Sequence, residues 1–273
     1  MRRLLTVWTI GVIVGFCLAT PSIARAQNDD PAALKLAEPD FTLVALPTSL
    51  RLPKFKSAFR VTHRFTRPLG DGDFANLVED LFGIDSGARI GLEYRFGIIP
   101  NGQIGIHRTS DRTIEFFGQY SVLRQGSGSV LDVSALYTID GTNNFKDSYS
   151  PALGAIVSRS FGTVAAVYFE PIWVNNSNDL PQELTDHNDT FLFGVGARVR
   201  IRPTVYVVGE YVPRTGYKPG VDHGSFAIEK RAGGHTFQLN FSNAFGTTMG
   251  QIARGGPDGN EWFMGFNISR KFY

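Results

Sequence analysis

The stretch that decides the fold class is the C-terminal one, Glu261-Trp-Phe-Met-Gly-Phe-Asn-Ile-Ser-Arg-Lys-Phe-Tyr273. Apolar side chains occupy alternate positions, namely Trp262, Met264, Phe266, Ile268 and Phe272. Polar or small residues stand between them, namely Glu261, Gly265, Asn267, Ser269 and Lys271. A period of two is that of a β-strand, whose successive side chains point to opposite faces. The pattern therefore predicts a strand with one apolar and one polar face.

The length and the aromatic ends of this strand suggest where it lies. Ten residues of tilted strand span roughly the 25 Å apolar band of an outer-membrane barrel, with aromatic residues at both interfaces. Here Tyr273 ends the chain, and Phe263 lies one such length upstream. The stretch resembles the closing strand of bacterial outer-membrane β-barrels, which typically end in an aromatic residue. We therefore predict a membrane β-barrel.

The N-terminus has the pattern of an export signal. Arg2 and Arg3 precede an apolar stretch over 4–18, and Ala24-Arg-Ala26 follows as a cleavage site. This indicates a cleaved signal peptide over 1–26, with an uncleaved anchor as the alternative. The only cysteine, Cys17, lies inside it, so the mature chain is expected to have no disulfide, thiol nucleophile or attached haem.

The charge balance excludes one class of partner. The chain has 27 basic and 25 acidic residues. Removal of Arg2, Arg3 and Arg25 leaves 24 basic residues, and the mature net charge becomes −1. Nothing here indicates binding to nucleic acid. The mature chain also has no run of about 18 apolar residues, so only a closed barrel would span lipid.

Residues 27–55 form a proline-rich leader ahead of the predicted barrel over 56–273. Pro31, Pro39, Pro47 and Pro53 argue against a central strand or a long helix there. The apolar run over 41–46 has two possible fates. It tucks against or into the barrel, or the leader is disordered in the periplasm.

Strand-like stretches fill the rest of the chain, and they predict an up-and-down antiparallel barrel of about twelve strands. The two stretches over 151–160 and 163–174 are apolar on both faces, so their registers are poorly defined. The stretches are 56–66, 87–97, 102–109, 112–123, 129–139, 151–160, 163–174, 189–201, 204–212, 224–231, 234–244 and 260–273.

The connections alternate in length. Short connections are expected at 98–101, 124–128, 161–162, 202–203 and 232–233, and long ones at 67–86, 140–150, 175–188, 213–223 and 245–259. Outer-membrane barrels have short periplasmic turns and longer extracellular loops, whereas a soluble β-sandwich has no reason to alternate. The connection after the third strand is short where a long one is expected.

One long connection has a helical period. Phe74, Leu77, Val78, Leu81 and Phe82 share one helical face, Asp73 is a candidate N-cap, and Gly83 is a candidate end. We expect this short helix in the first outer loop to pack on neighbouring loops. The barrel mouth and the outer leaflet are the alternatives.

The polar faces of the strands hold the candidate site. If they line the lumen, their charges are nearly balanced, which predicts no strong preference for anions or cations. Alternatively, the charges pair with one another and rigidify a filled barrel, because twelve strands lie between filled and open sizes. Arg231, Glu170 and Glu229 belong to the same faces. The candidate lumen-lining charges are Arg60, Arg64, Arg89, Glu93, Arg95, Glu115, Asp132, Arg198, Arg200 and Glu210.

Other chemical signals are weak, and we predict no cofactor, metal or catalytic residue. The five histidines have no metal-ligand spacing and are expected at interfaces or in loops. Lipid-hydrolysing barrels resemble this chain in size and use a Ser and a His on the outer wall. Ser242 is a candidate, but His235 on the same strand lies about 23 Å away. The glycines of Phe193-Gly-Val-Gly-Ala197 are expected to relieve crowding in a curved strand.

Several segments resemble a family of bacterial barrels named domain of unknown function 5777. They are Leu50-Arg-Leu-Pro-Lys54, Leu81-Phe-Gly-Ile-Asp-Ser-Gly-Ala-Arg-Ile-Gly-Leu-Glu-Tyr-Arg-Phe96, Ile106-His-Arg-Thr-Ser-Asp111, Gly233-Gly-His-Thr-Phe-Gln-Leu-Asn240 and Arg270-Lys-Phe-Tyr273. The resemblance covers about residues 48–273, implies a barrel in the outer membrane of a Gram-negative bacterium, and transfers no functional residue.

We predict a narrow porin-like pore or small-solute conduit in contact with the lipid bilayer, with its solute or protein partner unidentified. The alternatives are a structural or recognition barrel with a filled lumen, and an enzyme that modifies lipid.

Overall fold

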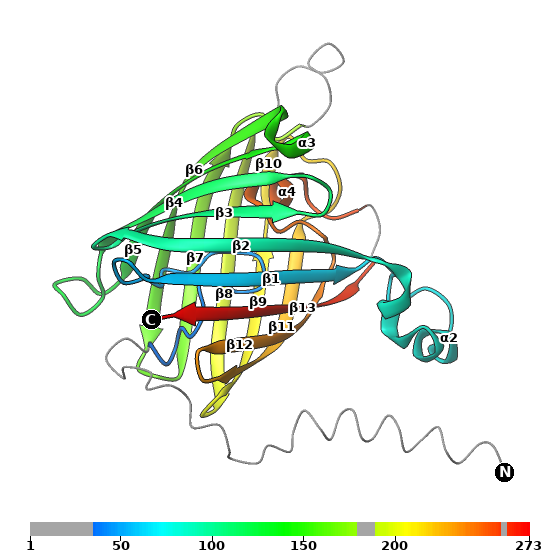
Figure 1. Ribbon diagram of the computed structural model, residues 1–273, viewed down its shortest axis with the longest axis horizontal. Coiled ribbons are helices and arrows are strands. Elements are labelled where there is room, and N and C mark those ends of the chain that lie inside the picture. The colour runs from blue at the N-terminus through cyan, green and yellow to red at the C-terminus, as the bar shows by residue number, and fades with distance from the viewer. Residues whose placement is uncertain (1–34, 179–188, 258–260) are drawn as a thin grey trace.

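The computed structural model describes residues 35–178, 189–257 and 261–273 (Figure 1). The predicted signal peptide over 1–26 lies outside the described residues. Within the described residues, no helix is both long enough and apolar enough to cross a membrane.

Twelve antiparallel strands form one closed sheet, as the alternation predicts. Each strand pairs with the next along the chain, and a further short strand, β10 (Arg214–Gly216), extends the pairing on β8. The strands of the closed sheet are β1 (Ser57–Phe65), β2 (Ala88–Ile99), β3 (Gly102–Thr109), β4 (Ile114–Leu123), β5 (Asp132–Gly141), β6 (Asp147–Phe161), β7 (Ala165–Val174), β8 (Thr190–Arg202), β9 (Val205–Val212), β11 (His223–Ala232), β12 (His235–Ser242) and β13 (Phe263–Phe272).

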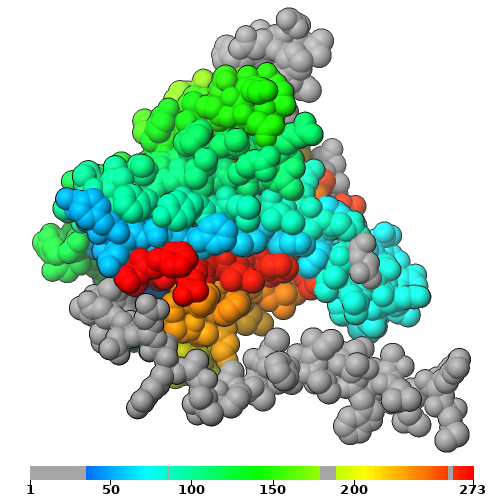
Figure 2. All heavy atoms as spheres, viewed as in Figure 1, coloured from blue at the N-terminus to red at the C-terminus, as the bar shows by residue number. Residues whose placement is uncertain are grey.

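The first and last strands close the barrel. Arg60 of β1 stands opposite Ser269 of β13 in an antiparallel register that runs the length of both strands. Figure 2 shows the blue β1 beside the red β13 on the outer surface. Closure leaves no sheet edge with unpaired backbone groups, which is a requirement for a sheet surrounded by lipid.

The alternation of side chains on the wall confirms the predicted parity. On β2, Leu92 and Tyr94 point outward and are about half exposed, whereas the residues that follow each of them, Glu93 and Arg95, are buried in the lumen. The same arrangement on β13 puts Phe266 outside and Asn267 inside. The outer wall is therefore apolar, and much of the inner wall is polar.

Strands β6 and β7 are apolar on both faces, and the structure gives the reason. Ile156 of β6 and Ile172 of β7 point inward and are fully buried, while Leu153 and Phe169 point outward. These strands line an apolar side of the lumen. The inner faces of these two strands have fewer polar residues than those of the other strands, with Ser158 and Glu170 among them, so the polar pattern that defines the register is weaker.

The two ends of the barrel differ in their connections. We call the end with short connections the turn end, and it includes Tyr273, while the other end is the loop end. Two connections at the loop end are short. The β3–β4 connection over 110–113 is short as expected, whereas the β5–β6 connection over 142–146 is shorter than the expected 140–150, because both strands extend into it. The loop end has the helical segments α2 (Phe74–Glu79), η1 (Leu81–Ser86), α3 (Thr142–Phe145) and α4 (Met249–Arg254) (Figure 1).

The predicted helix of the first long loop forms, but the expectation that it packs on neighbouring loops is wrong. Asp73 caps α2 by accepting a hydrogen bond from the Asn76 N–H at 2.9 Å. The helix ends at Glu79, because Leu81 and Phe82 adopt positive φ angles that break the helical path. No residue of α2 is buried, and Phe74 is 74% exposed.

Close packing at the barrel seam leads to a first testable prediction, for Gly265→Ala. A Cβ atom at Gly265 would lie 2.3 Å from the backbone oxygen of His63 on β1, so the two strands must separate. We expect a loss of about 1–3 kcal/mol in the free energy of unfolding, measured by urea titration in detergent micelles. The matched control is Gly118→Ala, where no atom lies within 4 Å and a change within about 0.5 kcal/mol is expected. Equal midpoints for the two variants would contradict the tight seam.

Candidate functional site

The lumen is filled by a segment that belongs to no strand. Residues 35–53, which we call the plug, pass into the barrel, and Leu43, Val44 and Leu46 are completely buried there. Lys35 lies beside Asp132 at the turn end, and Phe55 pairs with Gly97 at the same end. The plug therefore enters and leaves through one end, as a loop. Of the two alternatives for the apolar run over 41–46, the structure therefore agrees with insertion into the barrel.

A tight turn forms the tip of the plug. Thr42 and Pro47 face each other in an isolated bridge, and the Leu43 N–H donates to the Leu46 carbonyl at 2.8 Å. The turn directs three successive N–H groups, those of Val44, Ala45 and Leu46, at one carboxylate.

Glu210 of β9 supplies that carboxylate. Its oxygens accept from these three N–H groups at 3.0, 2.9 and 3.1 Å. They also accept from the Ser225 hydroxyl at 2.7 Å and contact His223 Nε2 at 3.1 Å. Hydrogen bonds to a charged acceptor are about twice as strong as neutral ones. Glu210 is therefore the main anchor of the plug tip.

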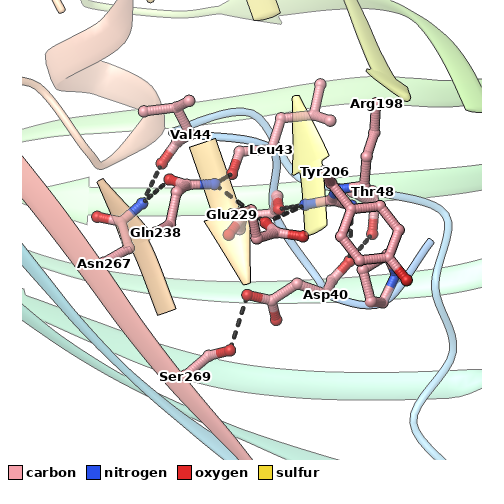
Figure 3. Close-up of polar contacts among 12 residues, drawn as sticks. Asp40, Leu43, Val44, Thr48, Arg198, Tyr206, Glu229, Gln238, Asn267 and Ser269 are labelled. Atoms are coloured by element: carbon pink, nitrogen blue, oxygen red, sulfur yellow. Dashed lines mark hydrogen bonds and ion pairs between the residues drawn. The ribbon is translucent and has the colours of Figure 1, made fainter. Parts of the chain in front are cut away.

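Wall side chains bind the carbonyl groups of the same turn (Figure 3). Arg198 Nη2 donates to the Thr42 carbonyl at 2.6 Å and to Glu229 at 3.0 Å. Gln238 donates to the Leu43 carbonyl at 2.8 Å, and Asn267 donates to the Val44 carbonyl at 2.9 Å. The polar side of the lumen thus binds mainly the backbone of the plug tip.

The returning part of the plug is held in the same manner. Gln119 donates to the Thr48 carbonyl at 2.9 Å. The side chain of Gln103 donates to the Leu50 carbonyl and accepts from the Leu52 N–H, both at 3.1 Å. These two glutamines also bond to each other at 2.9 Å. They act as a paired support for the backbone.

Lys35 anchors the start of the plug at the turn end. Its ammonium group pairs with Asp132 at 2.8 Å and with Glu38. Burial acts to lower the pKa of Lys35, but the two carboxylates outweigh it and the pKa is raised above its usual value. The lysine therefore keeps its charge, and this contact is an ion pair at neutral pH.

A second segment closes the loop end. Thr248 and Gln251 form a capping box at the start of α4, and Ile252 and Ala253 of this helix are buried in the lumen. Thr248 Oγ1 donates to Asp140 at 2.7 Å, and the Met249 N–H donates to Glu115 at 2.7 Å. The helix is fixed to two acidic side chains of the inner wall.

Little space remains between the plug and α4. A cavity of about 30 Å³ lies there, with Arg60, Glu93, His107, Glu115 and Met249 among its lining residues. That volume holds about two water molecules. The plug thus fills the lumen from the turn end, and α4 covers it from the loop end.

The structure places the sequence-predicted charges as follows. Arg60, Arg64, Glu93, Arg95, Glu115, Asp132, Arg198 and Glu210 are buried inside the barrel. Glu93 joins Arg60 at 2.7 Å and Arg95 at 2.9 Å. Arg89 lies at the loop end with its side chain 52% exposed, and Arg200 bonds to Thr163 near the turn end. These last two are not brought together with the others.

Sequence reasoning missed several residues of the lumen. The expectation that the histidines lie at interfaces or in loops is wrong for His107 and His223, which are buried in the lumen. Residue types likewise predicted neither helix α4 nor the role of the main-chain groups of the plug. The capping-box pattern Thr248-x-x-Gln251 is a signal that could have revealed α4.

The glycines of β8 have a role beyond relief of strand crowding. Gly194 faces the lumen, and a Cβ there would lie 3.0 Å from Leu46 Cδ1. A Cβ at Gly196 would lie 2.3 Å from Leu43 Cδ1. The two glycines therefore leave room for the two leucines of the plug tip.

The candidate nucleophile of a lipid-modifying enzyme is not on the outer wall. Ser242 points into the barrel and is completely buried, and its hydroxyl accepts from the Ala244 N–H at 3.1 Å. Lipid does not reach it there. Among the described residues, no group of three or more His, Cys, Asp or Glu side chains is arranged to hold a metal ion.

A closed antiparallel barrel with an apolar outer wall and a polar lumen defines the class of membrane β-barrels. The chain belongs to the family described as membrane bound beta barrel domain (DUF5777), whose model matches residues 40–272. The match begins at Asp40, so it includes the plug tip together with the barrel. A search among curated proteins finds no match.

Solved structures with the same fold include two porins. The NanC porin matches with a TM-score of 0.55 and 6% identity, over 80% of this chain and 99% of that chain. The KdgM porin in complex with disordered oligogalacturonate matches with a TM-score of 0.52 and 6% identity, again over 80% of this chain and 99% of that chain. At this identity, the likeness shows the fold alone.

Proposed function

We propose that this protein is an outer-membrane conduit for small solutes, closed in the present conformation by its plug and α4. The observation that supports it is a polar inner wall bound to a chain segment that is not part of the wall. A separate loop that enters and leaves at one end can withdraw without threading.

Unpaired polar groups on the inner wall support a second, open state. The carboxylate of Glu170 and the side-chain amide of Asn240 are buried and have no hydrogen-bond partner among the described residues. A buried polar group without a partner costs free energy that contact with water would recover. Withdrawal of the plug would bring water or a polar solute to these groups.

The same proposal includes the location and the orientation. The chain would be exported by the signal peptide over 1–26, with its turn end in the periplasm and its loop end outside. The plug would then withdraw toward the periplasm. The nearly balanced charges of the lumen suggest weak selection between anions and cations. Its fold-mates of known structure are porins, which agrees with transport rather than catalysis.

Single-channel recording with cysteine variants tests the proposal. The mature chain would have no cysteine, so a single introduced thiol reports one position. Thr138 of β5 faces the lumen, and its neighbour Tyr137 faces outward. We expect the mature protein in planar bilayers to show discrete current steps. A bulky charged thiol reagent should reduce the steps of Thr138→Cys and leave those of Tyr137→Cys unchanged.

The dense hydrogen bonding of the plug favours a second candidate, a recognition barrel whose lumen stays filled. That candidate predicts no current steps at any voltage, even when the plug anchor Glu210 is removed. Such a result would reject the conduit and leave the exposed loops as the functional surface.

A further inference from the structure

We infer that the lumen is a binding site for short aliphatic peptides, and that the plug tip occupies it as a tethered ligand. This inference rests on the proposed conduit function, because it names the solute class that the lumen would take. It is drawn from three features of the inner wall: its contacts with the peptide backbone, its two leucine sockets, and its apolar side.

The first feature is that the wall binds groups found in every peptide. Arg198, Gln238 and Asn267 donate to three successive carbonyl groups, those of Thr42, Leu43 and Val44. The Glu210 carboxylate accepts from the N–H groups of Val44, Ala45 and Leu46. These contacts depend on a backbone in a tight turn and not on the side chains that it bears. Any peptide with the same turn can make them.

The second feature is a pair of sockets for leucine side chains. Gly196 makes room for Leu43, and Gly194 makes room for Leu46. A larger residue at Gly196 would overlap the Leu43 side chain, since a Cβ there would lie 2.3 Å from it. The sockets therefore select aliphatic side chains three positions apart in the ligand.

The third feature is the apolar side of the lumen. Ile156, Ile172, Leu192 and Val208 form a buried cluster together with the plug residues Leu43 and Leu46. A carbohydrate carries hydroxyl groups around each ring, and these would lose water against this aliphatic side without gaining partners. A short aliphatic peptide satisfies both sides of the lumen, so we assign the peptide class.

Thiol labelling of the mature protein, which would have no cysteine of its own, tests this inference. Ala45→Cys places a thiol in the buried tip, where a maleimide reaches it only after the plug withdraws. The probe is a blocked synthetic peptide of residues 38–50, which contains no cysteine. A peptide that takes the vacated site favours the withdrawn state. At ten times its Kd, it should raise the labelling rate about tenfold.

Three controls define what the site recognises. The same peptide N-methylated at Val44, Ala45 and Leu46 loses the contacts with Glu210 and should have no effect. A peptide with glycine in place of Leu43 and Leu46 should also fail, because it leaves both sockets empty. Lys54 is exposed at the turn end, so Lys54→Cys is the third control. Its labelling rate should not respond to any peptide.

The outcomes separate the inference from the proposed function. Peptide-dependent labelling without any current steps would reject the conduit and keep the peptide site. Current steps with no response to the peptide, or an equal response to the N-methylated peptide, would overturn the peptide site alone. A response to an acidic oligosaccharide in place of the peptide would also overturn it. If Ala45→Cys never reacts, the plug is a permanent core and the inference is wrong.

Discussion

Glu210→Ala is expected to weaken the binding of the plug and to increase the open population of the barrel. The substitution leaves the N–H groups of Val44, Ala45 and Leu46 without their acceptor inside the lumen. Each buried donor left unsatisfied costs about 1–3 kcal/mol, so a total of about 3 kcal/mol or more opposes insertion of the plug. The open population should therefore rise by about a hundredfold, since 1.4 kcal/mol corresponds to a factor of ten.

The measurement is the open probability in planar bilayers. The wall should survive the change, because the backbone pairing of β9 with β8 and β11 does not involve the Glu210 side chain. Glu210→Gln keeps one acceptor oxygen and should have a smaller effect. Arg200→Ala is the matched control, since Arg200 bonds to Thr163 and is not bonded to the plug. An open probability equal to that of the wild type would show that the plug does not control the lumen.

Arg198→Ala is expected to destabilise the folded barrel more than any exposed substitution. Arg198 and Glu229 are both completely buried, and their side chains meet at 3.0 Å. Removal of the arginine leaves the Glu229 charge without its partner and also frees the Thr42 carbonyl. Breaking a buried ion pair in this way costs about 3–5 kcal/mol. Urea unfolding in detergent micelles, followed by tryptophan fluorescence, measures the loss.

A double-mutant cycle separates the ion pair from the plug contact. Arg198→Ala with Glu229→Ala removes both charges and should recover part of the lost stability, because no unpaired charge remains. Arg159→Ala is the control, since Arg159 is exposed, and a change within about 0.5 kcal/mol is expected. Additive effects of the two single substitutions would contradict the coupling.

The strands could be predicted from sequence because the two faces of each strand meet different environments, which imposes a period of two on the residues. On β2 and β13, lipid on one side and polar contacts on the other impose strict alternation, and both strands lie within a few residues of the predicted stretches. On β6 and β7, inward Ile156 and Ile172 belong to one apolar cluster with the plug residues Leu43 and Leu46. There the alternation disappears, for a reason that no local pattern reveals.

The lumen was less predictable than the wall. The alternation of residues places Arg60, Glu93 and Glu210 on the polar faces of their strands. It does not predict which groups these side chains bind. Glu210 binds main-chain groups more than 160 positions away in the chain. Main-chain groups have no sequence signature, so the most important contacts of the site could not be read from residue types.

What the sequence by itself determined is the class of protein. Apolar and polar side chains alternate along each strand, so the apolar ones contact lipid on the outside of the barrel. Closure of the sheet gives its backbone N–H and C=O groups hydrogen-bond partners within the sheet. What only the tertiary structure decided is the state of the lumen. Occupation by residues 35–53 depends on long-range contacts from β3, β4, β5, β8, β9, β12 and β13, and only the closed barrel brings these seven strands around one segment.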